Sequence, residues 1–514
     1  MNPTKQSKQF QILSKDKLLV MMGVMEFGKK EITKKSKDFS RWYTDVILKA
    51  ELADYAPVKG CMVIRPYGYA LWEGVQKHLG QAIKASGVPN AYFPLFIPHS
   101  FLEKEKEHVK GFSPELAVVT HGGGKKLTEP LVVRPTSETI MYPLFKKWIQ
   151  SWRDLPFKVN QWCNIVRWEL RTYLFLRTLE FLWQEGHTAH ATHEEAEEEA
   201  LARMRMYRDF VEGVLAIPTI VGKKSAAEKF AGAENTYTVE ALMPDGKALQ
   251  CGTSHNLGQN FAKPFAIQFQ DETGQLQYVH QTSWGLSTRV IGALIMAHGD
   301  DNGLVLPPKI APVQVVVIPI DPADKKQSEY AKNVVAGLVP ASPAGRPASN
   351  EATTRVATTI DSRLQYTPGY KYNEWELKGV SLRAEIGERE VKEGTVTLVR
   401  RDTNEKFKVQ SSKFKVTVEE TLDAIQKNLY QKARNYLDKS TREVKEYAEF
   451  KKVMAETRGF IKAFWCGSNE CETKIKEETK ASIRAIPLEA KEVAEKCIYC
   501  GKSPATLVFF AQAY

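Results

Sequence analysis

The feature that most constrains the fold is a proline-rich segment, Pro307-Pro308-Lys309-Ile310-Ala311-Pro312, in the interior of a 514-residue chain. Its prolines interrupt helices and strands, so the segment predicts a boundary between domains. A chain of this length is also too long for a single hydrophobic core. The patterns of apolar residues differ on the two sides of the segment, which predicts that each side folds separately.

Before this boundary, short apolar strands are interspersed with helices. Leu71, Val75, Leu79 and Ile83 fall on one face of a helix predicted at 70–86. An acidic helix is predicted at 193–214, and strands at 92–97, 131–133, 164–166, 266–269 and 277–280. This order predicts an α+β domain on an antiparallel sheet. The sequence has neither a G-x-G-x-x-G turn after a strand nor a G-x-x-x-x-G-K-[ST] loop, so phosphate binding cannot rest on either glycine loop.

After the boundary, strands at 313–320, 353–358, 380–386 and 395–400 and a helix at 329–338 predict a smaller α/β domain. A long charged helix at 418–450 and a cysteine-bearing tail follow. We therefore predict a basic arm at 1–38, an α+β domain at 39–309, an α/β domain at 310–410 and a metal-binding domain at 411–514. The arm carries one apolar patch at 18–22.

The formal net charge of +11 favours a polyanionic partner, although many basic proteins bind no nucleic acid. No stretch approaches eighteen consecutive apolar residues, so we expect no membrane span. The lysine-rich first forty residues lack the apolar core of a secretory signal. We therefore expect a cytoplasmic protein.

The tail contains two close cysteine pairs, Cys466 with Cys471 and Cys497 with Cys500. Thiolates paired on tight turns suit a closed tetrahedral zinc site, which has no open position for water and is therefore structural. The alternative is four free thiols. The three remaining cysteines, Cys61, Cys163 and Cys251, are expected to be small buried residues.

Two arginine segments carry the chemistry of the first domain. Arg167-Trp168-Glu169 ends an apolar strand, and a short loop leads to Arg177 and then to Phe181 on the return strand. Arginine forks suit phosphate oxygens, and Phe181 can stack on a purine. The alternative is a surface hairpin with a salt bridge. Downstream, a glycine-containing turn at 283–288 brings Arg289 to the start of an apolar helix, which suits a second phosphate-binding or base-stacking arginine.

Two other patterns are not assigned a site. His121-Gly122-Gly123-Gly124 resembles an oxyanion loop, but no G-x-S-x-G segment accompanies it, so we expect a flexible loop. His187, His190 and His193 are spaced by three, which places them on no common strand face, and we predict no second metal site there.

The two arginine segments resemble motifs 2 and 3 of class II aminoacyl-tRNA synthetases, and Gly60-Cys-Met-Val-Ile-Arg-Pro66 resembles motif 1. Four further segments resemble prolyl-tRNA synthetases of the archaeal and eukaryotic type: Arg134-Pro-Thr-Ser-Glu-Thr139, Phe181-Leu-Trp-Gln-Glu-Gly-His187, Gln250-Cys-Gly-Thr-Ser-His-Asn-Leu-Gly-Gln259 and Trp375-Glu-Leu-Lys-Gly-Val-Ser-Leu-Arg-Ala-Glu-Ile-Gly387. The resemblance covers residues 38–514.

This resemblance implies a class II catalytic domain, an anticodon-binding domain at 310–410 and a small zinc-binding C-terminal domain. It implies ATP-dependent activation of L-proline, with Mg²⁺, and transfer to tRNA(Pro) by a homodimer formed through motif 1. Arg167 is the implied catalytic residue, bridging the ATP α-phosphate and the proline carboxylate. The implied ATP-binding residues are Arg167, Glu169, Arg177, Thr178, Phe181, Gln250, Thr253, Ser287 and Arg289. Those implied for proline are Thr136, Glu138, Arg167, Trp183, Glu185, His187, His255, Ser283, Trp284 and Gly285, and those for the anticodon are Glu374, Lys378, Arg383 and Glu385. The terminal Tyr514 is implied to fold back toward the catalytic domain.

The chain departs from the family in the motif 2 loop, which is one residue shorter and has Leu179 where an arginine is usual. It also leaves no room between Glu185 and Cys251 for the editing domain of bacterial relatives, so misactivation of alanine or cysteine is expected. Two alternatives remain open. One is a synthetase-like regulatory or RNA-binding protein that has lost catalysis, and the other is a zinc-stabilised RNA-binding protein without ATP chemistry.

Overall fold

The computed structural model describes residues 31–104, 116–169, 171–338 and 356–514. Most of the predicted basic arm, its patch at 18–22 and residues 353–355 of a predicted strand lie outside these ranges. Within them, no helix combines the length and apolarity needed to cross a bilayer.

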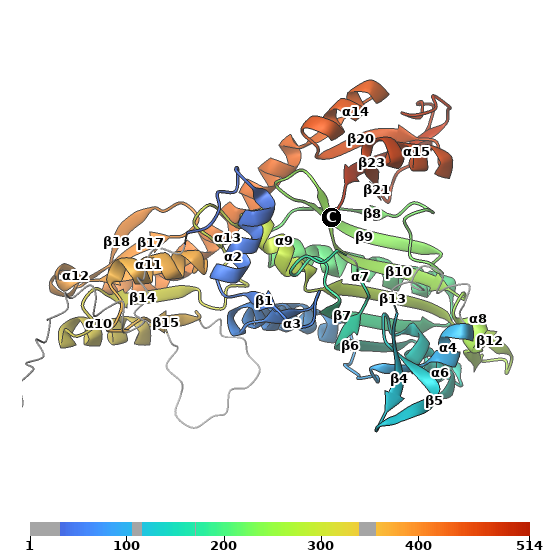
Figure 1. Ribbon diagram of the computed structural model, residues 1–514, viewed down its shortest axis with the longest axis horizontal. Helices are drawn as coiled ribbons and strands as arrows, with labels where there is room; N and C mark the ends of the chain where they lie inside the picture. Colours follow the sequence, from blue (N-terminus) through green and yellow to red (C-terminus); the bar gives the residue numbers. More distant parts are fainter. Residues whose placement is uncertain (1–30, 105–115, 170, 339–355) are drawn as a thin grey trace, which may run out of the picture.

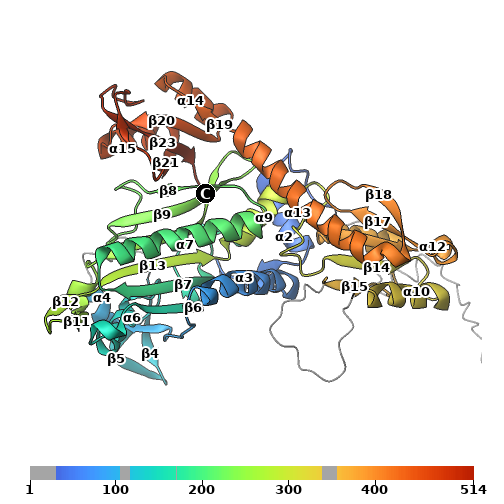
Figure 2. The same cartoon turned by 180° about the vertical axis from the view of Figure 1, so that it is seen from behind.

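The centre of the molecule is a six-stranded antiparallel sheet, as the pattern before the proline-rich segment predicts (Figures 1 and 2). Its order is β6 (Phe157–Val166), β7 (Glu180–His190), β13 (His280–Ser287), β10 (Ala248–Gly258), β9 (Asn235–Leu242) and β8 (Thr219–Lys223). β6 and β7 form the hairpin predicted around Arg167, with Val166 opposite Glu180. The arginine thus leaves the sheet at the loop end of this hairpin, directly after β6.

Helix α7 (His193–Gly213) covers one face of the central sheet (Figure 2). Thr192 and Glu195 form a capping box at its start, so both residues satisfy backbone N–H groups that lack helical partners. Ala200, Met204 and Tyr207 are buried between the helix and the sheet. The opposite face of the sheet is therefore left for a ligand.

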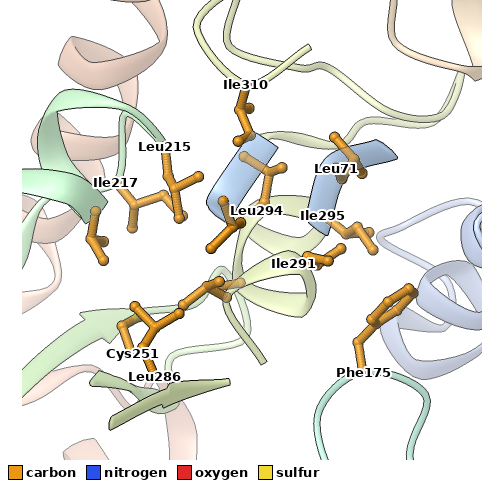
Figure 3. Packing of buried hydrophobic residues seen from close by; sticks show 14 of the residues in the cluster. Leu71, Phe175, Leu215, Ile217, Cys251, Leu286, Ile291, Leu294, Ile295 and Ile310 are labelled. Atoms are coloured by element: carbon orange, nitrogen blue, oxygen red, sulfur yellow. The ribbon is translucent and has the colours of Figure 1, made fainter. Parts of the chain in front are cut away.

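The largest apolar cluster lies where α3 (Pro66–Ala85) and α9 (Arg289–His298) meet (Figure 3). Leu71 faces this cluster together with Val75, Leu79 and Ile83, as the periodicity predicts. Ile310 of the proline-rich segment packs on α3 at Gly74, where an added Cβ would come within 2.8 Å of its side chain. The segment is thus packed against the first domain.

A three-stranded sheet with the order β3 (Phe96–Pro98), β5 (Lys125–Val133) and β4 (Ala117–Gly122) lies beside the central sheet. The segment His121–Gly124, predicted to be a flexible loop, instead ends strand β4 and forms the turn of the β4–β5 hairpin at Gly123 and Gly124. Gly123 and Gly124 both have positive φ, 57° and 75°, which glycine adopts without strain. Most of the strand predicted at 92–97 is irregular, and only β3 pairs.

After the proline-rich segment, a mixed sheet has the order β15 (Thr358–Ile360), β14 (Val315–Pro319), β16 (Leu382–Ile386), β17 (Thr395–Arg400) and β18 (Lys406–Gln410). β14 pairs in parallel with β15 and with β16, whereas β17 pairs antiparallel with β16 and with β18. Helices α10 (Lys325–Ala336), α11 (Pro368–Leu377) and α12 (Glu388–Glu393) accompany the sheet, which confirms the predicted α/β pattern.

The prediction of one helix at 418–450 is wrong. Helix α13 (Phe414–Lys439) ends at Ser440, and β19 (Thr441–Glu443) precedes a separate helix, α14 (Tyr447–Glu456). β19 pairs in parallel with β20 (Phe460–Trp465), so sheet hydrogen bonds replace the helical ones at this point. The C-terminal sheet continues to β23 (Ala505–Gln512) and β21 (Ala481–Ala485), and α15 (Asn469–Thr479) packs on it.

His190, at the end of β7, is only 3% exposed. Because of this burial, we expect the folded state to lose stability in acid. Burial lowers its pKa to about 4. Below about pH 6.5 the unfolded histidine binds a proton that the folded one does not, so stability falls as the pH falls. Between pH 7 and pH 5 the loss is about 2 kcal/mol.

Urea unfolding at pH 7 and pH 5 checks this expectation. The His190→Gln variant should lose less stability over this interval than the unmodified chain, whereas His121→Gln, at an exposed histidine, should not differ from it. Equal pH dependence in the unmodified chain and His190→Gln would contradict the assignment.

Candidate active site

A cavity of about 250 Å³ opens on the face of the central sheet that α7 leaves free. Successive residues of a strand point to opposite faces of the sheet, so every second side chain of a strand faces the cavity. His187 of β7 lies opposite Ser283 of β13, which lies opposite His255 of β10. The predicted residues that line the cavity are Thr136, Glu138, Arg167, Phe181, Trp183, Glu185, His187, Gln250, Thr253, His255, Ser283, Trp284, Gly285, Ser287 and Arg289.

One end of the cavity is strongly positive. The guanidinium of Arg167 donates to the carbonyl of Pro135 at 3.0 Å and lies 5.6 Å from the ring of Phe181. Arg289 donates to the carbonyl of Leu176 at 3.2 Å. Burial, together with the nearby Arg167 and Arg177, lowers the pKa of Arg289 to about 10, so it stays charged at neutral pH. Two guanidiniums beside an aromatic ring suit a nucleotide phosphate and its base.

The other end carries carboxylates. The Oε1 of Glu185 accepts from Gln161 at 2.8 Å and from the hydroxyl of Ser137, and its Oε2 lies 3.2 Å from Nε2 of His187. Burial alone would raise the pKa of Glu185, but these hydrogen bonds leave it below its usual value.

Burial alone would lower the pKa of His187. The hydrogen bond to Glu185 and the nearby charges of Glu138 and Glu185 instead leave this pKa above its usual value. The hydroxyl of Thr136 donates to Glu138. Negative charge on the cavity wall suits a cationic amino or imino group.

Trp284 borders the cavity, but its indole lies on the opposite face of β13. A Cβ added to Gly186 would come within 2.1 Å of the ring, and the guanidinium of Arg203 lies 5.0 Å from its centroid. The predicted glycine-containing turn at 283–288 is also strand β13 as far as Ser287. Alternation along this strand sends Trp284 toward α7 and leaves Ser283 and Gly285 facing the cavity.

Three predicted ATP residues, Glu169, Arg177 and Thr178, do not line this cavity. Glu169 and Arg177 form an ion pair at 3.6 Å, and the hydroxyl of buried Thr178 donates to the carbonyl of Glu180 at 2.7 Å. Arg177 lines a neighbouring cavity of about 500 Å³, which shares Arg289 with the first.

The packing of the loop explains why a leucine, and not the usual arginine, stands at position 179. Leu179 is buried and donates its backbone N–H to the carbonyl of Gly60 at 2.9 Å. A Cβ at Gly60 would come within 2.9 Å of the Leu179 side chain. The shortened loop is therefore packed on the segment that resembles motif 1.

Residues of a loop at 224–233 also line the cavity, although no pattern in the sequence indicated them: Glu228, Lys229 and Phe230. The ring of Phe230 lies 4.8 Å from that of His255. Thr236, which follows the loop, contacts Nδ1 of His255 at 2.9 Å through its hydroxyl. The loop thus forms a wall beside the carboxylate end.

The four predicted anticodon residues lie in ion pairs. Glu374 pairs with Arg363 at 2.5 Å and with Lys378 at 3.2 Å. Arg383 and Lys406 both pair with Glu385, at 3.0 and 2.7 Å. Lys378 also lies 3.5 Å from Glu51, which precedes β1 (Ala53–Tyr55) in the first domain.

The four cysteines of the tail form one cluster. Their sulfur atoms all lie within 4.8 Å of one another, and Sγ of Cys466 is 3.7 Å from those of Cys471 and Cys500. Tetrahedral Zn–S bonds of about 2.3 Å require sulfur atoms about 3.8 Å apart. The cluster therefore has the donor set and spacing of a four-cysteine zinc site.

Tyr514 lies on the first domain. Its backbone N–H donates to the carbonyl of Ala248 at 3.2 Å, and Nζ of Lys247 is 4.8 Å from its ring centroid. Its side chain packs against the largest apolar cluster. The last residue therefore folds back onto the central sheet, as the resemblance implies.

Comparisons with known proteins agree with this geometry. Residues 123–298 match the tRNA synthetase class II core domain (G, H, P, S and T), residues 314–428 the anticodon binding domain, and residues 447–514 the C-terminal domain of prolyl-tRNA synthetase. The chain is 53% identical to the proline–tRNA ligase of Natranaerobius thermophilus, over 94% of this chain and 98% of that one. It is 52% identical to the proline–tRNA ligase of Ruminiclostridium cellulolyticum, over 98% and 100%. A prolyl-tRNA synthetase from Cryptosporidium parvum, solved with halofuginone and AMPPNP, superposes with a TM-score of 0.88 at 42% identity and covers 95% of this chain and 98% of that one. The chain therefore belongs to the class II prolyl-tRNA synthetase family.

Proposed function

We propose that the chain activates L-proline with ATP to form prolyl-adenylate and transfers the prolyl group to tRNA(Pro). The observation that carries this proposal is a single cavity with arginines at one end and carboxylates at the other. The arginine end suits the triphosphate, and the carboxylate end suits the proline imino group. The related bacterial proteins are named proline–tRNA ligases, which supports the same substrate.

In the proposed reaction, the proline carboxylate attacks the α-phosphorus of ATP, which is bound as its magnesium complex, and pyrophosphate leaves. Arg167 bridges the attacking carboxylate and the α-phosphate. Catalysis is then alignment of the two substrates and stabilisation of charge on the transferring phosphate. A ribose hydroxyl at the tRNA 3′ end next attacks the carbonyl carbon of the adenylate, and AMP leaves.

Phe181 and Arg289 are proposed to hold the adenine between them, with Gln250, Thr253 and Ser287 on the nucleotide. Thr136 and Glu138 are proposed to bind the imino group, and Trp183, Glu185, His187, His255, Ser283 and Gly285 to form the pocket for the ring. Glu169, Arg177 and Thr178 remain proposed ATP residues, with Arg177 on the neighbouring cavity that shares Arg289.

Proline-dependent exchange between ATP and pyrophosphate tests the first step, and charging of tRNA(Pro) tests the second. A protein that had lost catalysis would bind RNA without exchange, as would a zinc-stabilised RNA-binding protein. The presence of Arg167 and Arg289 in one cavity favours the enzyme.

We propose that the chain has the domain organisation of the archaeal and eukaryotic type, although the relatives named above are bacterial. The segment between β7 and β10 folds into α7, β8 and β9, all of which belong to the core itself. The match of 447–514 to the family's C-terminal domain and the long overlap with the Cryptosporidium structure support the same organisation.

An enzyme of this organisation should misactivate smaller amino acids. Alanine and cysteine underfill a pyrrolidine pocket without clashing with it, and each missing methylene discriminates by about 1–3 kcal/mol. We expect measurable alanine- or cysteine-dependent pyrophosphate exchange, and no hydrolysis of alanyl-tRNA(Pro) by the chain alone. Prompt deacylation of that tRNA would contradict the absence of an editing site.

We further propose the boundaries 39–309 for the catalytic domain, 310–410 for the anticodon-binding domain and 411–514 for the C-terminal domain, with 1–38 as an arm. Glu374, Lys378, Arg383 and Glu385 are proposed to exchange their ion pairs for hydrogen bonds to splayed anticodon bases. The four-cysteine cluster is proposed to bind structural zinc.

A homodimer through motif 1 is proposed because apolar side chains are exposed around β2 (Met62–Ile64). Val63 on this strand and Tyr55 on the paired β1 are 48% and 62% exposed. Tyr69 at the start of α3 is 41% exposed. A cytoplasmic location remains part of the proposal.

A further inference from the structure

The wall that residues 224–233 add to the cavity is held from outside the catalytic core. β8 is the edge strand of the central sheet, and residue Lys223 at its end exchanges two backbone hydrogen bonds of 2.8 Å with Ile486, just beyond β21. Figures 1 and 2 show β21 and α15 lying over this edge. The C-terminal unit therefore meets the catalytic sheet at the strand that leads into the loop.

The loop itself is anchored to α15. The hydroxyl of Ser225 donates to Oε1 of Glu472 at 2.8 Å, and both side chains are buried, 1% and 2% exposed. The backbone N–H groups of Glu228 and Lys229 donate to the carbonyl of Ser225, at 3.2 and 3.0 Å. Ser225 thus starts the turn that brings Glu228 and Lys229 to the cavity.

Three charged contacts reinforce this anchor. Nζ of Lys476, one turn after Glu472 on α15, lies 2.8 Å from Oε1 of Glu228. Below the loop, Arg484 of β21 and Lys224 both pair with the buried Glu240 of β9, at 3.0 and 2.8 Å. The contacts of Lys476 and Arg484 cross from the C-terminal unit to the catalytic domain, so the position of the loop depends on the position of α15.

The loop in turn contacts the carboxylate end of the cavity. The backbone N–H of Phe230 donates to the hydroxyl of Thr236 at 3.0 Å, and that hydroxyl contacts His255 at 2.9 Å. We propose that Glu472 is a positioning residue for the proline end of the cavity, acting through Ser225 on the loop that carries Phe230. The expected change in the KM for proline rests on the proposed function, whereas the expected change in the mobility of the loop does not.

Glu472→Ala tests the proposal. We expect the KM for proline in pyrophosphate exchange to rise about fivefold, the KM for ATP to change less than twofold, and kcat to change little, because the loop that forms the wall at the proline end loses its buried hydrogen bond to Glu472. Amide hydrogen exchange in peptides covering 225–233, measured without substrates, should become faster. Glu472→Gln should restore both values toward those of the unmodified chain, because its amide oxygen still accepts from Ser225.

Two further variants make the result specific. Ser225→Ala removes the same hydrogen bond from the other side, together with the longer one that the backbone N–H of Glu228 donates to the Ser225 hydroxyl at 3.3 Å. The double variant should therefore lose no more than Ser225→Ala alone. Glu477→Ala, at an exposed position on the same helix, should change neither measurement. If Glu472→Ala fails to fold, Ser225→Ala carries the test alone.

Unchanged loop exchange and an unchanged KM for proline in folded Glu472→Ala, or in Ser225→Ala if only that variant folds, would overturn the proposal. Additive effects of the two substitutions would also overturn it. If the unmodified chain shows no proline-dependent exchange, the proposed function fails, and the amide-exchange comparison still decides whether Glu472 positions the loop.

Discussion

Replacement of Arg167 by alanine is expected to lower proline-dependent pyrophosphate exchange by at least about 10²–10³-fold, the effect of removing one preorganised donor to transition-state charge. Arg167 lines the cavity directly after β6, and its Nε donates to the carbonyl of Pro135 at 3.0 Å. This contact holds the guanidinium at the cavity wall, where it is proposed to bind the α-phosphate and the proline carboxylate. The measurement is exchange at saturating ATP and proline, with thermal unfolding to show that the fold is retained.

Arg153→Ala is the matched control, because that guanidinium stacks on Trp152 at 4.7 Å and lines neither of the two cavities described above. Its exchange rate should equal that of the unmodified chain. Near-normal exchange in Arg167→Ala would contradict the role given to this arginine.

Loss of the four-cysteine site is expected to unfold the C-terminal unit. Structural zinc sites contribute about 10–16 kcal/mol of binding free energy, which folding of the surrounding domain requires. Cys497→Ala removes a buried thiol that is a proposed ligand, and should reduce bound zinc from about one ion per chain to none. Because α15 carries Cys471 and packs on the C-terminal sheet, limited proteolysis should then cut within 447–514.

The control is Cys61→Ala, at a cysteine outside the cluster, which should retain zinc and protease resistance. Elemental analysis of the purified proteins gives the zinc content. A Cys497→Ala protein with full zinc content would show that the cluster does not bind the ion.

The main elements of the fold could be predicted because their apolar periodicity is local. Leu71 and its partners mark α3, and the apolar run before Arg167 marks β6. The helix break at Ser440 could not be predicted, because the pairing of β19 with β20 that replaces the helix joins residues distant in sequence. The hairpin at Gly123 was interpreted as a loop because consecutive glycines give no sign of pairing.

The candidate site shows the same division. Residues in the segments that carry the family resemblance, such as Glu185 and Thr253, line the cavity, as the resemblance implied. The face on which a strand residue points depends on register, so the orientation of the Trp284 indole required the structure. Phe230 was missed because its loop has no motif, and its place is fixed by Thr236 and by contacts with α15.

The most direct test is pyrophosphate exchange by the purified chain with each amino acid supplied singly. We expect exchange with L-proline at the highest kcat/KM, weaker exchange with alanine or cysteine, and none above background with larger amino acids such as leucine. Absence of proline-dependent exchange in a folded, zinc-loaded protein supplied with ATP and Mg²⁺ would contradict the proposed function.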